Sequence, residues 1–415
     1  MKRVIFVDDE PNVLEGIKVS LHQMRDEWTM AFAHDAVRAL AMMEEAEEPF
    51  DVIVSDMNMP GMGGKDLLHV VKETYPQTVR MVLSGQLDAE NVVQAAAFAH
   101  QILRKPCEPA LLRERLTRAF ALNNYLKNCP MRDDLFAMCG IPSVPTVYWK
   151  LLNEINDEKP SIVKIGEIIE TDPSMSAKVL QVAHAAYRGT HNFSSIVDAV
   201  NLIGLKNIKG LVLMPGIFEL ADGSQLPEEV DLERMWKHAL QVAEFAKRIS
   251  QREHDDTEQN DEAYSAGLLH DIGLLIVATR MPDKFADAIE LRRSRGMSLM
   301  EAEKECFGAT HAEMGGFLLD LWGLPEHVVE AISFHLYPSS TPDHTYRMLL
   351  LDTRDGVSAL TAVHIANYLS EDLDDLIEEQ AKAKVDHIHL ADLNMSDRLS
   401  DWWDLCFASP TTDMA

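Results

Sequence analysis

The sequence predicts two folds in succession, an α/β doubly wound, flavodoxin-like domain followed by an all-α domain. Over about the first 120 residues, short apolar runs rich in β-branched residues alternate with amphipathic segments. This repeat is typical of a parallel sheet with helices on both faces. From Thr146 onward, long helical patterns follow one another with almost no strand signal. Between the two parts, Asn128–Pro145 contains three prolines and a glycine, which indicates a domain boundary.

The first part is expected to contain five strands, because buried parallel strands have continuous apolar runs. We expect these strands at Lys2–Val7, Thr29–Ala33, Phe50–Ser55, Arg80–Leu83 and Gln101–Arg104. The helices of this part are expected at Val13–Met24, Ala36–Glu45, Gly64–Thr74, Asp88–Ala99 and Ala110–Lys127.

The second part is expected to be helical, with the acidic stretch Glu253–Glu262 as a solvated loop between two helices. Its clearest helical patterns are Ile162–Glu170, Ser174–Tyr187, Ser195–Ile203, Leu232–Gln251, Tyr264–Arg280 and Thr310–Leu321. We therefore divide the chain into a first domain at 1–122, a linker at 123–140, a helical domain at 141–340, and a C-terminal helical extension and tail at 341–415.

Charge and composition exclude several classes of protein. The 415 residues carry a net charge of −29, of which −6 lies in residues 1–122 and −23 in the remainder. Binding to nucleic acid relies on clustered Lys and Arg, so neither part resembles a DNA-binding domain and a transcription factor is disfavoured. The chain shows no signal peptide and no apolar stretch long enough to span a membrane. Its five scattered cysteines form no CxxC pair, so we expect a cytoplasmic protein with reduced thiols.

Polar residues follow four of the predicted strands, at the edge of the sheet where ligands of doubly wound folds bind. The first strand ends in Asp8 and Asp9, the third in Asp56, the fourth in Ser84 and the fifth in Lys105. Converging carboxylates require a cation, and a hard ion such as Mg²⁺ suits carboxylates, a carbonyl and water. Ser84 and Lys105 would offer a hydroxyl and an ammonium to a phosphoryl oxygen. Taken singly, each residue could equally be a surface or capping residue.

Together these motifs resemble the receiver domain of two-component response regulators. The matching segments are VDDEPNV at 7–13, SDMNMPGMGG at 55–64, LSG at 83–85 and KPCEP at 105–109. The resemblance covers about residues 1–122 and implies that Asp56 accepts a phosphoryl group from a sensor histidine kinase or phosphotransfer protein. It implies that Asp8, Asp9, Asp56 and the Asn58 carbonyl bind Mg²⁺. It also implies that Ser84 and Lys105 contact the phosphoryl group, and that the Lys105–Pro106 bond is cis.

One position departs from the receiver pattern. Many receivers carry Tyr or Phe three residues before the lysine, where the ring turns inward after phosphorylation, but this chain has Ile102. We therefore expect its signal to be transmitted by other movements of the sheet and its last helices.

The helical part contains histidines that suggest a metal site. Imidazoles with a carboxylate suit transition metals, which activate water for phosphoester hydrolysis. Buried histidines that only hydrogen-bond to carbonyl groups are the commoner alternative. The candidate ligands are His238, His270, Asp271, His311, His335 and Asn367.

The context of these histidines resembles the HDOD family, a relative of the HD phosphohydrolases. The matching segments lie at 141–152, 168–189, 199–213, 266–275 and 308–332. The resemblance implies a regulatory output that acts through an unidentified protein partner. Asn367 stands where active HD enzymes have Asp, and Leu274 stands where cyclic-dinucleotide hydrolases usually have Lys. The metal site therefore looks vestigial. The alternative function is that of a phosphorylation-regulated, metal-dependent phosphohydrolase acting on a nucleotide or cyclic dinucleotide. The sequence also allows a homodimer.

Overall fold

The structure is a computed structural model of the 415-residue chain. The residues it describes are 2–85, 95, 98–128, 132–137, 141–143, 147, 150, 151, 154, 155, 157, 159–187, 195–213, 218–220, 231–339, 356–370 and 384–407. The chain forms two compact units, which are considered separately below. The first unit contains Met1–Ile169, Met175–Ala221 and Leu318–Leu324, and the second contains Glu170–Ser174, Asp222–Phe317 and Pro325–Ala415.

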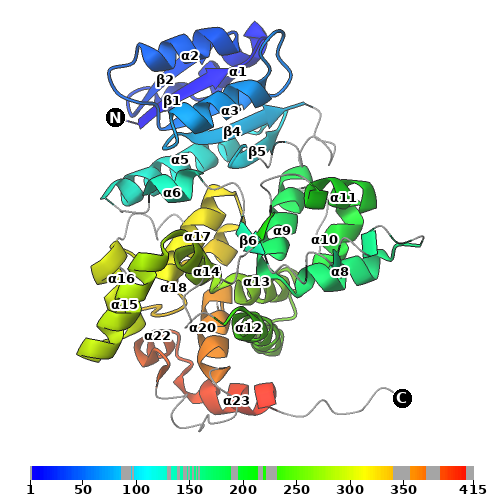
Figure 1. The fold of residues 1–415 in the computed structure, drawn as a ribbon, viewed down its shortest axis with the longest axis vertical. Coiled ribbons are helices and arrows are strands. Elements are labelled where there is room, and N and C mark those ends of the chain that lie inside the picture. Colours follow the sequence, from blue (N-terminus) through cyan, green and yellow to red (C-terminus); the bar gives the residue numbers. More distant parts are fainter. Residues whose placement is uncertain are drawn as a thin grey trace. The chain divides into compact units, whose positions relative to one another are not determined.

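The first unit is built on a five-stranded parallel sheet with the strand order β2-β1-β3-β4-β5 (Figure 1). Its strands are β1 (Lys2–Val7), β2 (Trp28–Ala33), β3 (Val52–Asp56), β4 (Val79–Ser84) and β5 (Gln101–Arg104). All five predicted strands are present. The central β3 and β4 are buried along their whole length, as expected for strands covered on both faces. The doubly wound fold is confirmed.

Helices cover this sheet, with α2 and α3 packed side by side and α5 against β3 (Figure 1). The helices are α1 (Pro11–Ser20), α2 (Ala36–Glu44), α3 (Gly64–Thr74) and α5 (Pro109–Tyr125), with 3-10 turns η1 (His22–Met24) and η2 (Leu126–Asn128). Proline begins both α1 and α5, because its missing N–H costs nothing in the first turn of a helix. Most of the predicted helix Asp88–Ala99 lies outside the described residues.

The first unit also contains helical segments that follow the sheet in sequence, and a short strand pair. These are α6 (Arg132–Ala137), most of α8 (Ile162–Glu170) and α9 (Pro173–Tyr187), α10 (Ile196–Ile203), α11 (Leu205–Leu213), β6 (Ile141–Ser143) and β7 (Phe218–Leu220). The parallel pairing of β6 with β7 was not predicted. It joins two three-residue strands that are far apart in sequence and too short to show a periodic pattern.

A buried ion pair lies inside the first unit, between its sheet domain and the segment Leu318–Leu324. The Arg118 guanidinium of α5 contacts the Asp320 carboxylate, and both residues are buried. The side-chain amide of Gln101 on β5 donates to the Asp320 carbonyl oxygen at 3.2 Å. The Lys178 ammonium of α9 lies 4.2 Å from the ring centroid of Trp322.

The second unit is helical. It contains α12 (Leu232–Glu253), α13 (Thr257–Leu269), α14 (Ile272–Arg280), α15 (Pro282–Arg295), α16 (Leu299–Phe307), most of α17 (His311–Leu321), α18 (Glu326–Phe334), α20 (Ala359–Leu369), α22 (His387–Asp392), η3 (Ser396–Arg398) and α23 (Leu399–Phe407). Helix α13 packs against α12, α18 and α20. Among the described residues, no helix is both long and apolar enough to cross a membrane.

Two expectations for this unit are wrong. The acidic stretch Glu253–Glu262 is not a loop throughout, because α13 begins at Thr257. The Asp256 carboxylate caps that helix by accepting from the Glu258 N–H at 2.9 Å, and acidic residues are favourable at a helix N-terminus. The predicted helix Tyr264–Arg280 is two helices, α13 and α14, separated at His270 and Asp271.

Candidate functional sites

The first candidate site lies at the carboxyl ends of the strands of the parallel sheet. The Lys105 ammonium, just after β5, lies 2.6 Å from Asp8 Oδ2 and 2.6 Å from Asp56 Oδ1. Asp8 follows β1, and Asp56 is the last residue of β3. Both carboxylates are largely buried, with residue exposures of 2% and 7%. The lysine therefore neutralises part of the negative charge that the two carboxylates concentrate here.

Backbone groups fix the orientation of the two carboxylates. The Asn58 N–H donates to Asp56 Oδ2 at 2.8 Å, and the Glu10 N–H donates to Asp8 Oδ1 at 3.0 Å. Ser84 is buried at the end of β4, and Asp9 is half-buried beside Asp8. The structure brings Asp8, Asp56 and Lys105, three of the residues predicted from sequence, into direct contact.

The lysine is suited to remain charged in this pocket. Burial alone would lower the pKa of Lys105, but its hydrogen bonds with Asp56 and Asp8 outweigh that effect and raise the pKa above its usual value. The Lys105–Pro106 peptide bond is cis, as expected.

A glycine explains how α3 begins so close to this pocket. A Cβ at Gly64 would lie 1.9 Å from the Asp56 carbonyl oxygen. The Gly64 N–H also donates to the Met57 carbonyl oxygen at 3.0 Å. A side chain at this position would push the Asp56 backbone away, so Gly64 is part of the support of Asp56.

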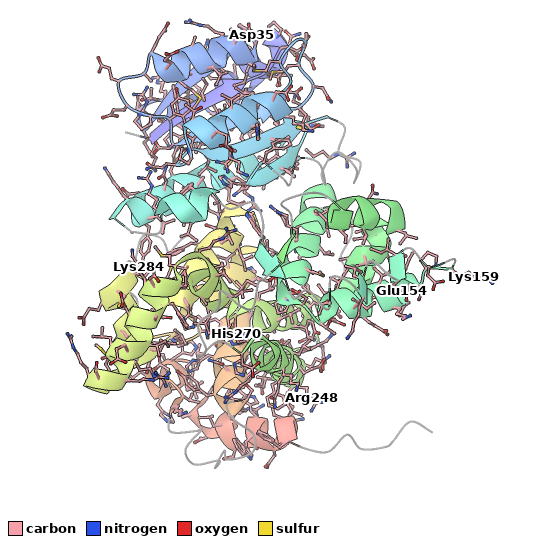
Figure 2. All side chains as sticks on the ribbon, viewed as in Figure 1. Asp35, Glu154, Lys159, Arg248, His270 and Lys284 are labelled. Atoms are coloured by element: carbon pink, nitrogen blue, oxygen red, sulfur yellow. The ribbon has the colours of Figure 1, made fainter. Side chains whose placement is uncertain are left out.

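The second candidate site is a cluster of histidines around Asp271 in the helical unit, where Figure 2 shows His270 among the surrounding helices. Its members come from separate elements: His238 from α12, His270 and Asp271 from the α13–α14 junction, His311 from α17, His335 after α18 and Asn367 from α20. Two groups of possible metal ligands share Asp271, one with His238 and His270, the other with His311 and His335. The structure thus brings together all six residues that the sequence predicted.

Hydrogen bonds at Nδ1 turn three imidazoles toward Asp271. His270 Nδ1 donates to the Gly267 carbonyl at 2.7 Å, and His335 Nδ1 donates to the Ile332 carbonyl at 2.9 Å. A ring nitrogen that faces a carbonyl oxygen must carry the proton, so Nε2 of each ring has a lone pair when the ring is neutral. His311 has the same orientation, with Nδ1 bonded to a carboxylate as described next.

Glu303 of α16 is the residue of this cluster that the sequence did not reveal. It is completely buried, and its carboxylate oxygens lie 2.8 and 2.9 Å from His311 Nδ1. It also accepts from the His311 N–H at 3.1 Å. Glu303 therefore sets both the position and the ring orientation of His311, in the way that carboxylates support metal-binding histidines.

The distances around Asp271 resemble those between neighbouring ligands of one ion. His311 Nε2 and His335 Nε2 lie 3.4 and 3.7 Å from Asp271 Oδ1, and His270 Nε2 lies 3.3 Å from Oδ2. For metal–nitrogen bonds of about 2.1 Å, neighbouring ligand atoms of a tetrahedral ion lie about 3.4 Å apart. His335 Nε2 is fully buried and has no hydrogen-bond partner among the described residues.

The electrostatics of the cluster keep Asp271 ionised. Burial would raise the pKa of Asp271, but His270 and His311 outweigh burial and hold that pKa well below its usual range. Burial would lower the pKa of His311, but the Glu303 and Asp271 carboxylates raise it to about 10. Burial, reinforced by His270, lowers the pKa of His335 well below its usual value.

Close helix packing brings the ligands together at Gly273. A Cβ at this position of α14 would lie 1.8 Å from the His311 carbonyl oxygen and 2.7 Å from the Gly315 nitrogen. The glycine thus allows α14 to approach α17 closely, which holds Asp271 near His311.

The space beside Asp271 is small. A hollow lined by Pro173, Met235, Ala239, Leu268, Asp271, Ile272 and Leu275 offers about 20 Å³ to the centres of water molecules. A single water needs roughly 10–15 Å³ by this measure. The hollow therefore has room for one or two waters beside Asp271.

Two family models match the chain. The response regulator receiver domain matches residues 4–117, and the HDOD domain matches residues 141–338. The first match covers the parallel sheet with its pocket. The second covers most of the helical part, with five of the six cluster residues, His238, His270, Asp271, His311 and His335.

Curated relatives each match part of the chain. The response regulator protein PilR of Pseudomonas aeruginosa is 31% identical over 30% of this chain and 27% of its own length. Chemotaxis protein CheY-3 of Vibrio cholerae is 30% identical over 28% of this chain and 91% of its own length. The chain spans between 23% and 38% of the length of the first four curated relatives that it matches.

Among solved structures, the chain is similar to the MmoQ response regulator from Methylococcus capsulatus. The two are 23% identical, and the match covers 64% of this chain and 98% of that protein, with a TM-score of 0.43.

Proposed function

Because this chain belongs to the response regulators, with an N-terminal receiver domain and a C-terminal HDOD domain, we propose that phosphorylation of Asp56 switches the partner binding of its HDOD domain. The phosphoryl donor is a sensor histidine kinase or a phosphotransfer protein. We assign residues 1–122 to the receiver, 123–140 to the linker, 141–340 to the HDOD domain and 341–415 to a helical extension and tail, in a cytoplasmic protein.

The observation that carries this proposal is the environment of Asp56. Its carboxylate ends a buried strand, is held by the Asn58 N–H, and contacts the Lys105 ammonium that would pair with a bound phosphoryl group. Mg²⁺ would bind Asp8, Asp9, Asp56 and the Asn58 carbonyl, ligands of the oxygen type that this ion prefers. It would neutralise charge on the incoming phosphoryl group, while Ser84 donates to one phosphoryl oxygen.

Radiolabelled acetyl phosphate tests this assignment. The wild type is expected to incorporate label in the presence of Mg²⁺ and to lose incorporation when the Mg²⁺ is chelated. Asp56→Ala is expected to remain unlabelled, whereas the exposed Asp26→Ala serves as a matched control and is expected to be labelled normally. Mg²⁺-dependent labelling of Asp56→Ala would place the acceptor elsewhere.

The output is proposed to be binding to another protein. The residues after 122 carry a charge of −23, which repels nucleic acid. A phosphoryl group adds about 1.5–2 negative charges, and the resulting change in the receiver would alter the surface offered to the partner or to a second copy of the chain. Affinity capture with phosphorylated and unphosphorylated protein should recover a partner with only one of the two forms. Identical partners from both forms would argue against a phosphorylation switch.

The HDOD domain has a second candidate function, as a transition-metal protein built on the histidine cluster. The convergence of His238, His270, Asp271, His311 and His335 favours this role. When bound, the metal would supply a Lewis acid that polarises a bound water. Hydrolysis of a nucleotide or cyclic dinucleotide is the alternative. Elemental analysis should detect metal in the wild type and none in Asp271→Ala, and hydrolysis assays on the loaded protein decide the alternative.

A further inference from the structure

The histidine cluster has two halves that share Asp271, one with His238 and His270 and the other with His311 and His335. The hydrogen bonding of the two halves differs, and this difference predicts how many ions the cluster binds. We propose that the cluster binds one divalent transition-metal ion, through His311, His335 and Asp271, and that Asn367 excludes His238 from coordination. This inference rests on the metal-binding role proposed above and adds the ligand set and the stoichiometry.

In the half around His238, hydrogen bonds already satisfy the polar atoms. His238 Nε2 lies 3.0 Å from Asn367 Oδ1 and 3.3 Å from His270 Nε2. Since His270 Nδ1 donates to the Gly267 carbonyl, its Nε2 is an acceptor. A proton on His238 Nε2 therefore faces two acceptors, the Asn367 oxygen and the His270 nitrogen. That proton occupies the position where a cation would have to bind.

In the half around His335, the proton of the His335 ring points away from Asp271. His335 Nδ1 donates to the Ile332 carbonyl, so its Nε2 carries a lone pair, and this buried atom has no hydrogen-bond partner in the described part of the chain. Leaving a buried polar atom unsatisfied costs about 1–3 kcal/mol. A cation between His335 Nε2, His311 Nε2 and Asp271 Oδ1 would satisfy it, because the two nitrogens lie 3.7 and 3.4 Å from that oxygen.

The chemistry of the three ligands indicates the class of ion. Two imidazoles and one carboxylate that leave further positions open suit Fe²⁺, Mn²⁺ or Zn²⁺ rather than Ca²⁺ or Mg²⁺.

Glu303 acts in this site as a positioning residue. It holds His311 at both Nδ1 and the main-chain N–H, so that Nε2 faces Asp271. Removing a supporting carboxylate of this kind typically weakens metal affinity 10- to 100-fold.

The test is a measurement of metal per chain on the full-length protein. After chelation, separate samples are loaded with Fe²⁺ without oxygen, with Mn²⁺ or with Zn²⁺, freed of unbound metal and analysed by mass spectrometry. We expect one equivalent in the wild type, in His238→Ala and in His387→Ala, an exposed control, and none in His335→Ala. Asn367→Asp, which supplies a carboxylate to the His238 half, should take up a second equivalent.

The outcomes separate this inference from the metal-binding role itself. Wild type that binds no metal in any sample would overturn both. Two equivalents in the wild type, or loss of metal in His238→Ala, would overturn the ligand set while leaving metal binding intact. Metal retained at one equivalent in a folded His335→Ala would also overturn the ligand set and leave metal binding intact.

Glu303 is tested with Co²⁺, whose visible absorption reports its coordination geometry. Glu303→Gln should weaken Co²⁺ binding 10- to 100-fold and alter the absorption bands, while Glu305→Gln, an exposed position on the same helix, should change neither. Circular dichroism establishes that both variants are folded. A folded Glu303→Gln with unchanged affinity and spectrum would show that Glu303 does not position the ligand.

Discussion

The buried ion pair between Arg118 and Asp320 gives the sharpest prediction for stability. Both side chains are almost fully buried, with 3% and 2% of their surface exposed. The Asp320→Asn variant keeps the shape of the side chain and removes its charge. The Arg118 guanidinium then stays buried, 3.8 Å from the Glu114 carboxylate.

The magnitude follows from the cost of leaving one charge of a buried pair without its partner. Breaking such a pair typically costs about 3–5 kcal/mol. The Glu114 carboxylate attracts the guanidinium and so recovers part of this cost. Because Glu114 is half-exposed, solvent screens the contact, which is worth at most about 1 kcal/mol. We therefore expect Asp320→Asn to lower the free energy of unfolding by about 2–4 kcal/mol.

Urea unfolding followed by circular dichroism measures this loss, and a double-mutant cycle isolates the pair. Arg118→Met, Asp320→Leu and the double variant complete the cycle. The double variant should be more stable than the sum of the single losses predicts, since it buries no unpaired charge. Arg113→Met, at an exposed position of α5, should change the unfolding free energy by less than about 0.5 kcal/mol. A loss below about 1 kcal/mol in Asp320→Asn would refute the reasoning.

Three further predictions concern close packing and acid stability. Gly64→Ala should slow acetyl phosphate labelling and destabilise the receiver, because its Cβ would overlap the Asp56 carbonyl oxygen. The control Gly16→Ala, in an open helical position, should be labelled at the normal rate. Equal labelling rates in the two variants would contradict the steric argument. Gly273→Ala should reduce metal binding, measured by elemental analysis, because its Cβ would displace His311; a folded variant with a full equivalent of metal would count against this. Burial lowers the pKa of His184 to about 4, below its unfolded value of 6.5, so its contribution to stability is present above pH 6.5 and is lost as pH falls toward 4. The loss of stability is at most about 3 kcal/mol. His184→Gln should therefore flatten the pH dependence of the unfolding free energy, measured with urea between pH 7 and 4.5. An unchanged slope would exclude His184 as the source of that pH dependence.

The receiver was predictable from sequence because its strands are continuous apolar runs and its topology is constrained. In a parallel sheet all carboxyl ends meet at one edge, so residues that follow separate strands, such as Asp8, Asp56 and Lys105, are brought together without any knowledge of side-chain packing. The identities of the cluster histidines were also predictable, since each belongs to a short motif.

Features that depend on tertiary packing were not predictable in the same way. Glu303 lies eight residues before His311, across the turn at Gly308, and nothing in the local pattern indicates that the two side chains meet. The break between α13 and α14 was missed because apolar residues continue through His270 and Asp271 without proline. The start of α13 was missed because Asp256 was counted as one more acid of a charged stretch, whereas its carboxylate caps the helix.

The position of Lys105 has a consequence for how the receiver responds to its ionic environment. An ammonium already lies between Asp8 and Asp56, so the pocket carries a counter-ion of its own, and we expect the receiver to fold without a bound metal. If Mg²⁺ binds this pocket as we propose, changes in free Mg²⁺ should alter how fast Asp56 is phosphorylated and leave the fraction of folded receiver constant.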